Sequence, residues 1–195
     1  MKKDIILAGV GGQGILSIAA IIGYAAVETG LFLKQAEVHG MSQRGGEVQS
    51  HLRLSSSPIA SDLIPEGKAN LIISIEPMEA LRYLPMLAPD GWLITNTEPF
   101  INIPNYPEID KLMDEINNLP YHIALNADKI AKELNATKSV NMVVLGAASP
   151  FLDINYEKME NAIRTIFKRK GNEIVDINIA AMKAGKNYTE SVIKK

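Results

Sequence analysis

The sequence predicts an α/β fold in which helices cover a mostly parallel β-sheet with some antiparallel pairing. A short apolar run at 5–8 ends in glycines and is followed by an apolar segment of helical length at 15–27. Several later apolar runs lack the polar alternation of a half-exposed strand, which is typical of strands buried on both faces. Only about ten residues separate the runs at 33–38 and 48–54. Because a crossover helix between parallel neighbours needs more, this pair is expected to be antiparallel.

The predicted strands are short apolar runs, at 5–8, 33–38, 48–54, 71–75, 92–95 and 122–125. Asp90-Gly91 is expected to turn the chain into the strand that begins at Trp92. Residues 98–107 contain three prolines and predict a surface connection, not a linker between domains. One domain over residues 1–195 is therefore expected, as is ordinary for this length.

Capping residues and periodicity locate the later helices. Glu76-Pro77 is expected to open a helix, because proline suits a first turn. Asn126 predicts the start of another, and Ser139 the start of a third that Pro150 ends. Apolar residues at helical spacing predict two more, at Met159, Ile163, Ile166 and Phe167 and at Ile174, Ile177 and Ala181.

Composition excludes several classes of function. The net charge of −2 leaves no electrostatic footprint for nucleic acid or an acidic membrane. The absence of cysteine excludes disulfides, thiolate catalysis and cysteine-held zinc or iron–sulfur clusters. Asp4 and the glycines after it divide the apolar N-terminus into pieces shorter than the ~20 residues of a membrane span. A cytoplasmic protein without a membrane anchor is expected.

A glycine-rich turn follows the first predicted strand, where residues 9–14 read Gly-Val-Gly-Gly-Gln-Gly. Gly9, Gly11 and Gly14 fit the G-x-G-x-x-G spacing of a dinucleotide-binding turn, with Gly12 and Gln13 between them. Glycine lets a phosphate approach the backbone, and the N-terminus of the next helix can hold it. The alternative is a turn that is glycine-rich only so that the helix packs closely on the sheet.

A second loop, Ser42-Gln43-Arg44-Gly45-Gly46, follows the second predicted strand and is expected at the same edge of the sheet. The Arg44 guanidinium suits a phosphate, because its fork donates two parallel hydrogen bonds. Contact with a partner subunit, or an ion pair with Glu37 or Glu47, are the alternatives. Glu37 is the only acid of the second predicted strand, where an NAD site places its ribose-binding acid. Its setting next to this loop weakens a dehydrogenase interpretation.

No catalytic residues and no metal ligands are recognised. His51 and His122 fall within predicted strands and are expected to be hydrogen-bonded sheet residues, whereas His39 lies beside the second loop. No G-x-S-x-G elbow is present. Lys168-Arg169-Lys170 is expected at a helix C-terminus, where cations complement the dipole, and not in a binding patch. These features predict an α/β domain that can bind a phosphate and that completes the active site of another subunit.

Two blocks, residues 8–15 and 36–46, closely resemble the beta subunits of indolepyruvate ferredoxin oxidoreductases. More broadly they resemble the gamma subunits, or gamma domains, of the 2-oxoacid:ferredoxin oxidoreductases. The resemblance extends through Ser61-Asp62 and 71–80 and covers essentially the whole chain. The second block is the more specific one and points to the arylpyruvate type. This resemblance implies a three-layer α/β/α, Rossmann-like fold of one gamma-type domain.

The resemblance also implies an activity: the oxidative decarboxylation of arylpyruvates to aryl-acetyl-CoA, with electrons passed to ferredoxin. A large alpha subunit would hold thiamine diphosphate and the iron–sulfur clusters, and this chain would be inactive without it. Coenzyme A (CoA) is then a co-substrate. Its pyrophosphate is expected to bind to the two glycine-containing segments, residues 9–14 and 42–46. The two motifs themselves give the expected binding residues, which are Gly9, Gly11, Gly12, Gln13, Gly14, Ser42, Gln43, Arg44, Gly45 and Gly46.

Two other interpretations stay open at this point. A stand-alone Rossmann-type regulator or NAD(P)-dependent dehydrogenase should bind its nucleotide without a partner. A pure assembly subunit with vestigial loops should bind no ligand at all.

Overall fold

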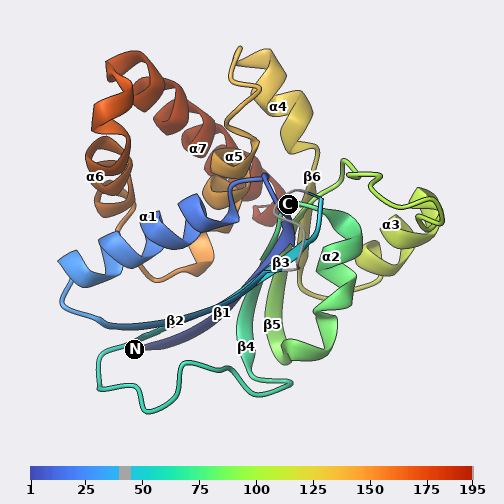
Figure 1. The fold of residues 1–195 in the computed structure, drawn as a ribbon, viewed down its shortest axis with the longest axis horizontal. Coiled ribbons are helices and arrows are strands. Elements are labelled where there is room, and N and C mark those ends of the chain that lie inside the picture. The colour runs from blue at the N-terminus through green and yellow to red at the C-terminus, as the bar shows by residue number, and fades with distance from the viewer. Residues whose placement is uncertain (40–44, 195) are drawn as a thin grey trace.

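The computed structural model of the protein describes residues 1–39 and 45–194. Within them, six strands form one sheet in the order β2-β3-β1-β4-β5-β6 (Figure 1). The strands are β1 (Lys2–Val10), β2 (Phe32–His39), β3 (Glu47–Ser55), β4 (Ala69–Ser74), β5 (Leu87–Asn96) and β6 (His122–Leu125). β3 is antiparallel to both β2 and β1, and the pairs β1–β4, β4–β5 and β5–β6 are parallel. The predicted mixed sheet and its antiparallel pair are confirmed.

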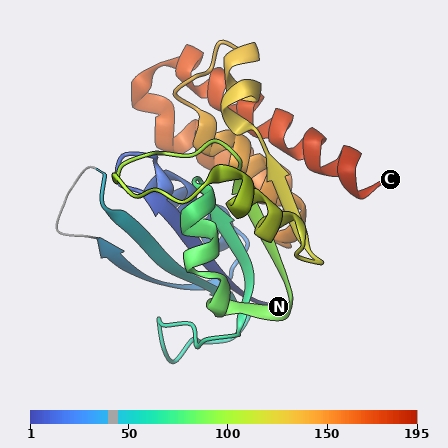
Figure 2. The ribbon, with the colours of Figure 1, turned by 90° about the vertical axis from the view of Figure 1, so that its right-hand side faces the viewer.

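Helices cover both faces of the sheet and make three layers (Figures 1 and 2). The helices are α1 (Ile15–Glu28), α2 (Pro77–Arg82), α3 (Ile109–Asn117), α4 (Ala127–Glu133), α5 (Val140–Ala148), α6 (Tyr156–Phe167) and α7 (Asn172–Ile193). One hydrophobic core joins Ile5 and Leu7 to helices α1, α5, α6 and α7. A smaller core joins Ile6 and Ala8 to α2 and α3. β1 serves both cores because successive strand side chains point to opposite faces.

The helix starts show which capping signals the chain uses. The Glu76 side chain accepts a hydrogen bond from the Glu79 N–H at 2.8 Å, and Pro77 occupies the first turn of α2, as predicted. Asn126 accepts from the Lys129 N–H at 2.8 Å and caps α4, also as predicted. Ser139 does precede α5, but its hydroxyl forms no capping hydrogen bond. That hydroxyl is therefore left for another partner.

The turn predicted at Asp90-Gly91 is wrong, because β5 runs straight through these residues. The pairing of β4 with β5 shifts register between Ala69 and Leu71 instead. A Cβ at Gly91 would lie 2.8 Å from the Ala69 carbonyl oxygen. The glycine thus permits a close backbone approach at a bulge, a use that local sequence cannot distinguish from a turn.

Two glycines bring the backbones of α5 and α7 into contact. A Cβ on Gly146 would lie 1.8 Å from the Met182 carbonyl oxygen, and one on Gly185 would lie 1.8 Å from the Val143 carbonyl oxygen. The Thr189 hydroxyl also donates to the Ala147 carbonyl at 2.9 Å. The long C-terminal helix is therefore held to the core at closest approach.

We expect Gly146→Ala to lower the free energy of unfolding by about 1–3 kcal/mol or more, because the added methyl meets backbone that cannot swing aside. Urea unfolding followed by circular dichroism measures the change. Gly23→Ala is the matched control, since its methyl would meet only the end of the Leu33 side chain, at 3.2 Å. Equal stability of Gly146→Ala and the parent protein would contradict the close contact.

Candidate functional site

The two glycine-containing segments lie side by side at the end of β1. The Gly11 N–H donates to the Gly46 carbonyl at 2.8 Å, and the Gly45 N–H donates to the Gly11 carbonyl at 3.4 Å. Both segments sit where β1 ends and β3 begins, since Val10 pairs with Glu47. They meet at the carboxyl edge of the parallel strands, where open α/β sheets bind ligands. Ser42, Gln43 and Arg44 lie outside the described residues.

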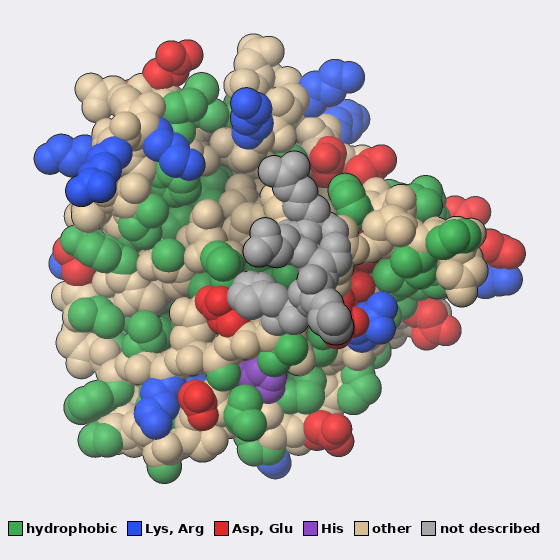
Figure 3. Space-filling model, in the orientation of Figure 1, with side chains coloured by type: hydrophobic (Ala, Val, Ile, Leu, Met, Phe, Trp, Pro, Cys, Tyr) green, Lys and Arg blue, Asp and Glu red, His purple; other side chains and the backbone are tan. Residues whose placement is uncertain are grey.

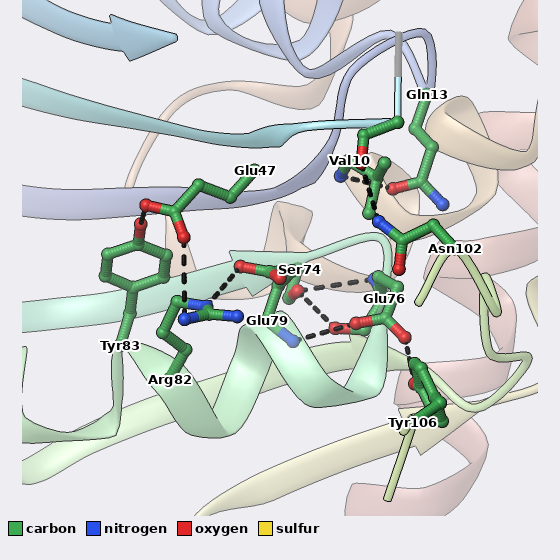
Figure 4. A network of polar contacts seen from close by, with 11 residues as sticks. Val10, Gln13, Glu47, Ser74, Glu76, Glu79, Arg82, Tyr83, Asn102 and Tyr106 are labelled. Carbon is green, nitrogen blue, oxygen red and sulfur yellow. Dashed lines mark hydrogen bonds and ion pairs between the residues drawn. The ribbon is translucent and has the colours of Figure 1, made fainter. Parts of the chain in front are cut away.

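The first segment is a closed turn with an open outer side. The Gln13 side-chain oxygen accepts from the Val10 N–H at 2.7 Å and holds the turn together (Figure 4). Gly12 has a φ of +101°, and a Cβ there would meet no protein atom within 4 Å. Gln13 therefore shapes the turn, while Gly12 leaves room for a guest to approach the backbone.

Asn141, at the start of α5, clamps the end of this turn. Its Nδ2 donates to the Gly14 carbonyl at 3.1 Å, and its Oδ1 accepts from the Met142 N–H at 3.1 Å. Gly14 is left-handed, with a φ of +81°, and a Cβ there would lie 2.5 Å from Asn141 Nδ2. Sequence reasoning missed Asn141, because no local pattern relates residues so far apart in the chain.

A cavity of about 550 Å³ adjoins the turn. It lies where α1, α5 and α7 begin, and its walls come from Gly12, Gln13, Gly14, Ser17, Asn135, Ala136, Thr137, Lys138, Ser139, Asn141, Phe167, Lys170, Ile174, Ile177 and Asn178. These walls include two lysines and no carboxylate. Lys and Arg side chains gather over α4 and α6 on this face of the molecule (Figure 3). Lys170, which was expected only to complement a helix dipole, is therefore part of a cavity wall.

On the other side of the turn, a polar network ties residues 97–108 to the site (Figure 4). The Asn102 side-chain amide donates to the Gly45 carbonyl at 2.6 Å. The buried Glu76 carboxyl accepts from the Tyr106 hydroxyl, and from the Phe100 N–H at 3.4 Å. Burial and the neighbouring Glu76 raise the pKa of the Tyr106 hydroxyl. Asn102 and Glu76 thus anchor this loop at two places.

The network continues through α2 to the start of β3. Arg82 pairs with Glu79 at 2.9 Å and with Glu47 at 3.5 Å, and the Tyr83 hydroxyl donates to Glu47 at 3.3 Å. Burial raises the pKa of the Glu79 carboxyl, and the hydrogen bond from Arg82 opposes that rise. Glu47, one of the two acids considered as a partner for Arg44, is therefore engaged from α2.

The histidines have structural roles where they are described. His51 Nδ1 accepts from the Ile64 N–H at 3.0 Å, and burial together with nearby Arg53 lowers its pKa. His122 Nδ1 lies 2.7 Å from the Leu119 carbonyl. The His39 backbone belongs to β2. Among residues 1–39 and 45–194, no group of three His, Asp or Glu side chains could hold a metal ion, and no helix there is long and apolar enough to cross a bilayer.

The chain thus has a Rossmann-like sheet with a glycine turn at the edge where open α/β sheets bind ligands, and its family follows from comparison. The chain belongs to the pyruvate ferredoxin/flavodoxin oxidoreductase family, whose model matches residues 4–188. It is 39% identical to the indolepyruvate oxidoreductase subunit IorB of Archaeoglobus fulgidus, over 98% of this chain and 97% of that protein. It is 36% identical to the subunit of the same name from Thermococcus kodakarensis, over 95% of each. These relatives do not favour the dehydrogenase alternative.

The fold also matches a solved structure, that of 2-oxoglutarate:ferredoxin oxidoreductase from Magnetococcus marinus with 2-oxoglutarate, coenzyme A and succinyl-CoA bound. The TM-score is 0.79 at 21% identity, over 97% of this chain. The chain spans 31% of the length of that longer protein. The three-layer fold implied by the sequence resemblance is thereby confirmed.

We expect Tyr106→Phe to lower the free energy of unfolding by about 1–3 kcal/mol, because the buried Glu76 carboxyl loses a donor. Amide hydrogen exchange should also speed up in residues 97–108. Tyr121→Phe is the control, since that tyrosine is 43% exposed and its hydroxyl forms no hydrogen bond within the described part of the chain. Unchanged exchange in Tyr106→Phe would show that Glu76 does not anchor the loop.

Proposed function

We propose that this chain is the small, cluster-free subunit of an indolepyruvate-type ferredoxin oxidoreductase. The observation that carries the proposal is its similarity, over nearly the whole length of both chains, to relatives named indolepyruvate oxidoreductase subunits. In the proposed reaction the bond between the carboxylate and the keto carbon of an arylpyruvate breaks and releases carbon dioxide. A thioester to CoA forms, and the electron pair passes to ferredoxin one electron at a time.

The composition of this chain fits a subunit that assists catalysis by a partner subunit. With no cysteine, it cannot hold an iron–sulfur cluster through thiolates. We assign thiamine diphosphate, the clusters and the docking of ferredoxin to a large alpha subunit. The small subunit then works as one gamma-type domain over residues 1–195, in the cytoplasm, and presents backbone donors and cations to CoA.

We assign the CoA pyrophosphate to the paired glycine segments. Gly12 leaves open space at the turn, and the start of α1 supplies the positive end of a helix dipole. Gly45 and Gly46 are hydrogen-bonded to Gly11 and so form the second wall of the same site. Gly9, Gln13 and Gly14 shape the turn, and Ser42, Gln43 and Arg44 complete the proposed binding set.

The proposal predicts activity only in the assembled complex. The purified chain, given thiamine diphosphate, CoA and ferredoxin, should not turn over indolepyruvate. Co-purified with its large subunit, it should support reduction of ferredoxin that depends on both indolepyruvate and CoA. An absorbance assay of ferredoxin reduction makes the comparison, with pyruvate and 2-oxoglutarate as competing substrates. A complex that prefers either of these over indolepyruvate would refute the assignment to the arylpyruvate type.

A second prediction tests the glycine turn with a matched pair of variants. Gly12→Ala should raise the KM for CoA roughly tenfold, because a methyl then stands where the backbone must be approached. Gly30→Ala is the control: Gly30 also has a positive φ, +78°, and a Cβ there would also meet no atom within 4 Å. The positive φ gives the Gly30 variant a similar backbone strain. Because Gly30 follows the far end of α1, away from the glycine turn, this variant should leave the KM for CoA unchanged. Equal KM values in the two variants would remove the pyrophosphate from this turn.

A further inference from the structure

The loop between β5 and α3, residues 97–108, presents apolar side chains to solvent. Phe100, Ile101 and Ile103 of this loop, and Ile109 at the start of α3, are 38% to 67% exposed, with Ile101 the most exposed. None of the four belongs to either hydrophobic core of the described residues. A single exposed apolar residue is ordinary, whereas several in one short segment mark a surface that another molecule covers.

The polar groups of the loop hold it in this arrangement. The Asn102 side chain donates to the Gly45 carbonyl at 2.6 Å. The Tyr106 hydroxyl and the Phe100 N–H both donate to the buried Glu76 carboxyl (Figure 4). Polar groups thus bind the loop to the protein while its large apolar side chains stay exposed, the reverse of what a free surface favours. An apolar surface that is already fixed loses little conformational entropy when a partner docks on it.

Exposed acidic side chains surround these apolar residues. Residues 97–117 carry five carboxylates and one cation, a net charge of −4: Glu98, Glu108, Asp110, Asp114 and Glu115 against Lys111. Lys111 is paired with Glu108 at 2.8 Å. Acidic and hydrophobic side chains lie side by side over this part of the molecule (Figure 3). An apolar centre with a charged rim is the anatomy of a protein interface, and the matching partner carries Lys and Arg at its own rim.

The sign of the charge also bears on a second copy of this chain as the occupant. Two copies related by a two-fold axis through this surface would place the same patch on both sides. Their acidic rims would then face each other, and like charges across an interface oppose association. The observations therefore favour a different protein.

The position of the loop identifies that protein. Asn102 is bonded to Gly45, and Gly45 is bonded to Gly11 of the glycine turn. In the proposed function, on which this inference rests, the turn holds CoA and the large subunit holds thiamine diphosphate. The thioester can form only where the two meet, so the large subunit must lie over this edge of the sheet. A protein that covers this edge also meets the loop.

We propose that Phe100, Ile101, Ile103 and Ile109 form the docking surface for the large subunit, which meets them with an apolar patch bordered by Lys and Arg side chains. Ile101 is the anchor, because the residues that become fully buried at the centre of an interface carry most of the binding energy. The acidic rim steers the encounter, so the association weakens as salt is added.

The first experiment measures the Kd between the full chain and the large subunit by surface plasmon resonance. Ile101→Asp should raise the Kd roughly tenfold or more. Leu63→Asp is the matched control, because Leu63 also lies in a loop and is 56% exposed. Its loop follows the end of β3, which pairs with Lys2 at the opposite edge of the sheet (Figure 1). The control should leave the Kd unchanged, and thermal unfolding should show both variants folded.

A second pair of variants tests the acidic rim. Asp114→Lys with Glu115→Lys reverses two charges near the end of α3, where cations complement the helix dipole and leave the helix stable. This double variant should raise the Kd at low salt roughly threefold or more and flatten its dependence on salt. Asp62→Lys with Glu66→Lys makes the same change of net charge in the loop of Leu63, and should leave the salt dependence close to that of the parent. Equal salt dependence in the two double variants would remove the acidic rim from the interface.

The remaining outcomes separate docking from catalysis. At concentrations above its raised Kd, Ile101→Asp should regain the turnover of the parent complex. Turnover that stays lost at saturation, a Kd that Ile101→Asp does not change, or a parent chain that does not bind the large subunit would each overturn the inference. Sedimentation velocity tests the second copy: self-association that Ile101→Asp abolishes would also overturn it. A complex that forms through this surface but does not turn over indolepyruvate would refute the proposed function and leave the docking surface standing.

Discussion

The candidate site depends on the direction of one strand, β3, in the sheet. β3 runs antiparallel between β2 and β1, whereas every other neighbouring pair is parallel. Because of that direction, the start of β3 lies against the end of β1, and the backbones of Gly11, Gly45 and Gly46 can bond to each other. A parallel strand in this position would begin at the opposite edge of the sheet. The two glycine segments are thus brought together by the direction of β3 in the sheet, and not by side-chain contacts.

The described residues around the glycine turn offer hydrogen-bond donors and positive charge. The glycine turn offers backbone donors, the cavity offers two cations, and the nearby Glu76 and Glu79 are occupied with Tyr106, Arg82 and the backbone of α2. These two acids organise residues 97–108 and the start of α2. The relatives of this chain are named as subunits of oxidoreductases.

Local signals predicted most of the fold and only part of the site. Glu76-Pro77 and Asn126 act within one helical turn of themselves, so their effects are legible in sequence. The roles of Gly91, Asn141 and Lys170 depend on what another segment brings close to them. Gly91 leaves room for a backbone carbonyl of β4. Asn141 bonds to a turn more than a hundred residues earlier in the chain. Lys170 borders a cavity that forms only when three helices have packed together. Such roles are absent from any short window of sequence.

The close approach of the α5 and α7 backbones at Gly146 and Gly185 has a consequence for the neighbouring cavity. The helices α5 and α7 that cross there also begin at the walls of the cavity. Where backbone meets backbone, there are no flexible side chains to absorb a sliding motion, so the two helix starts keep a fixed spacing. The cavity is then shaped during folding. A preformed cavity loses little conformational entropy when it is filled, so less of the interaction energy is spent on ordering the protein.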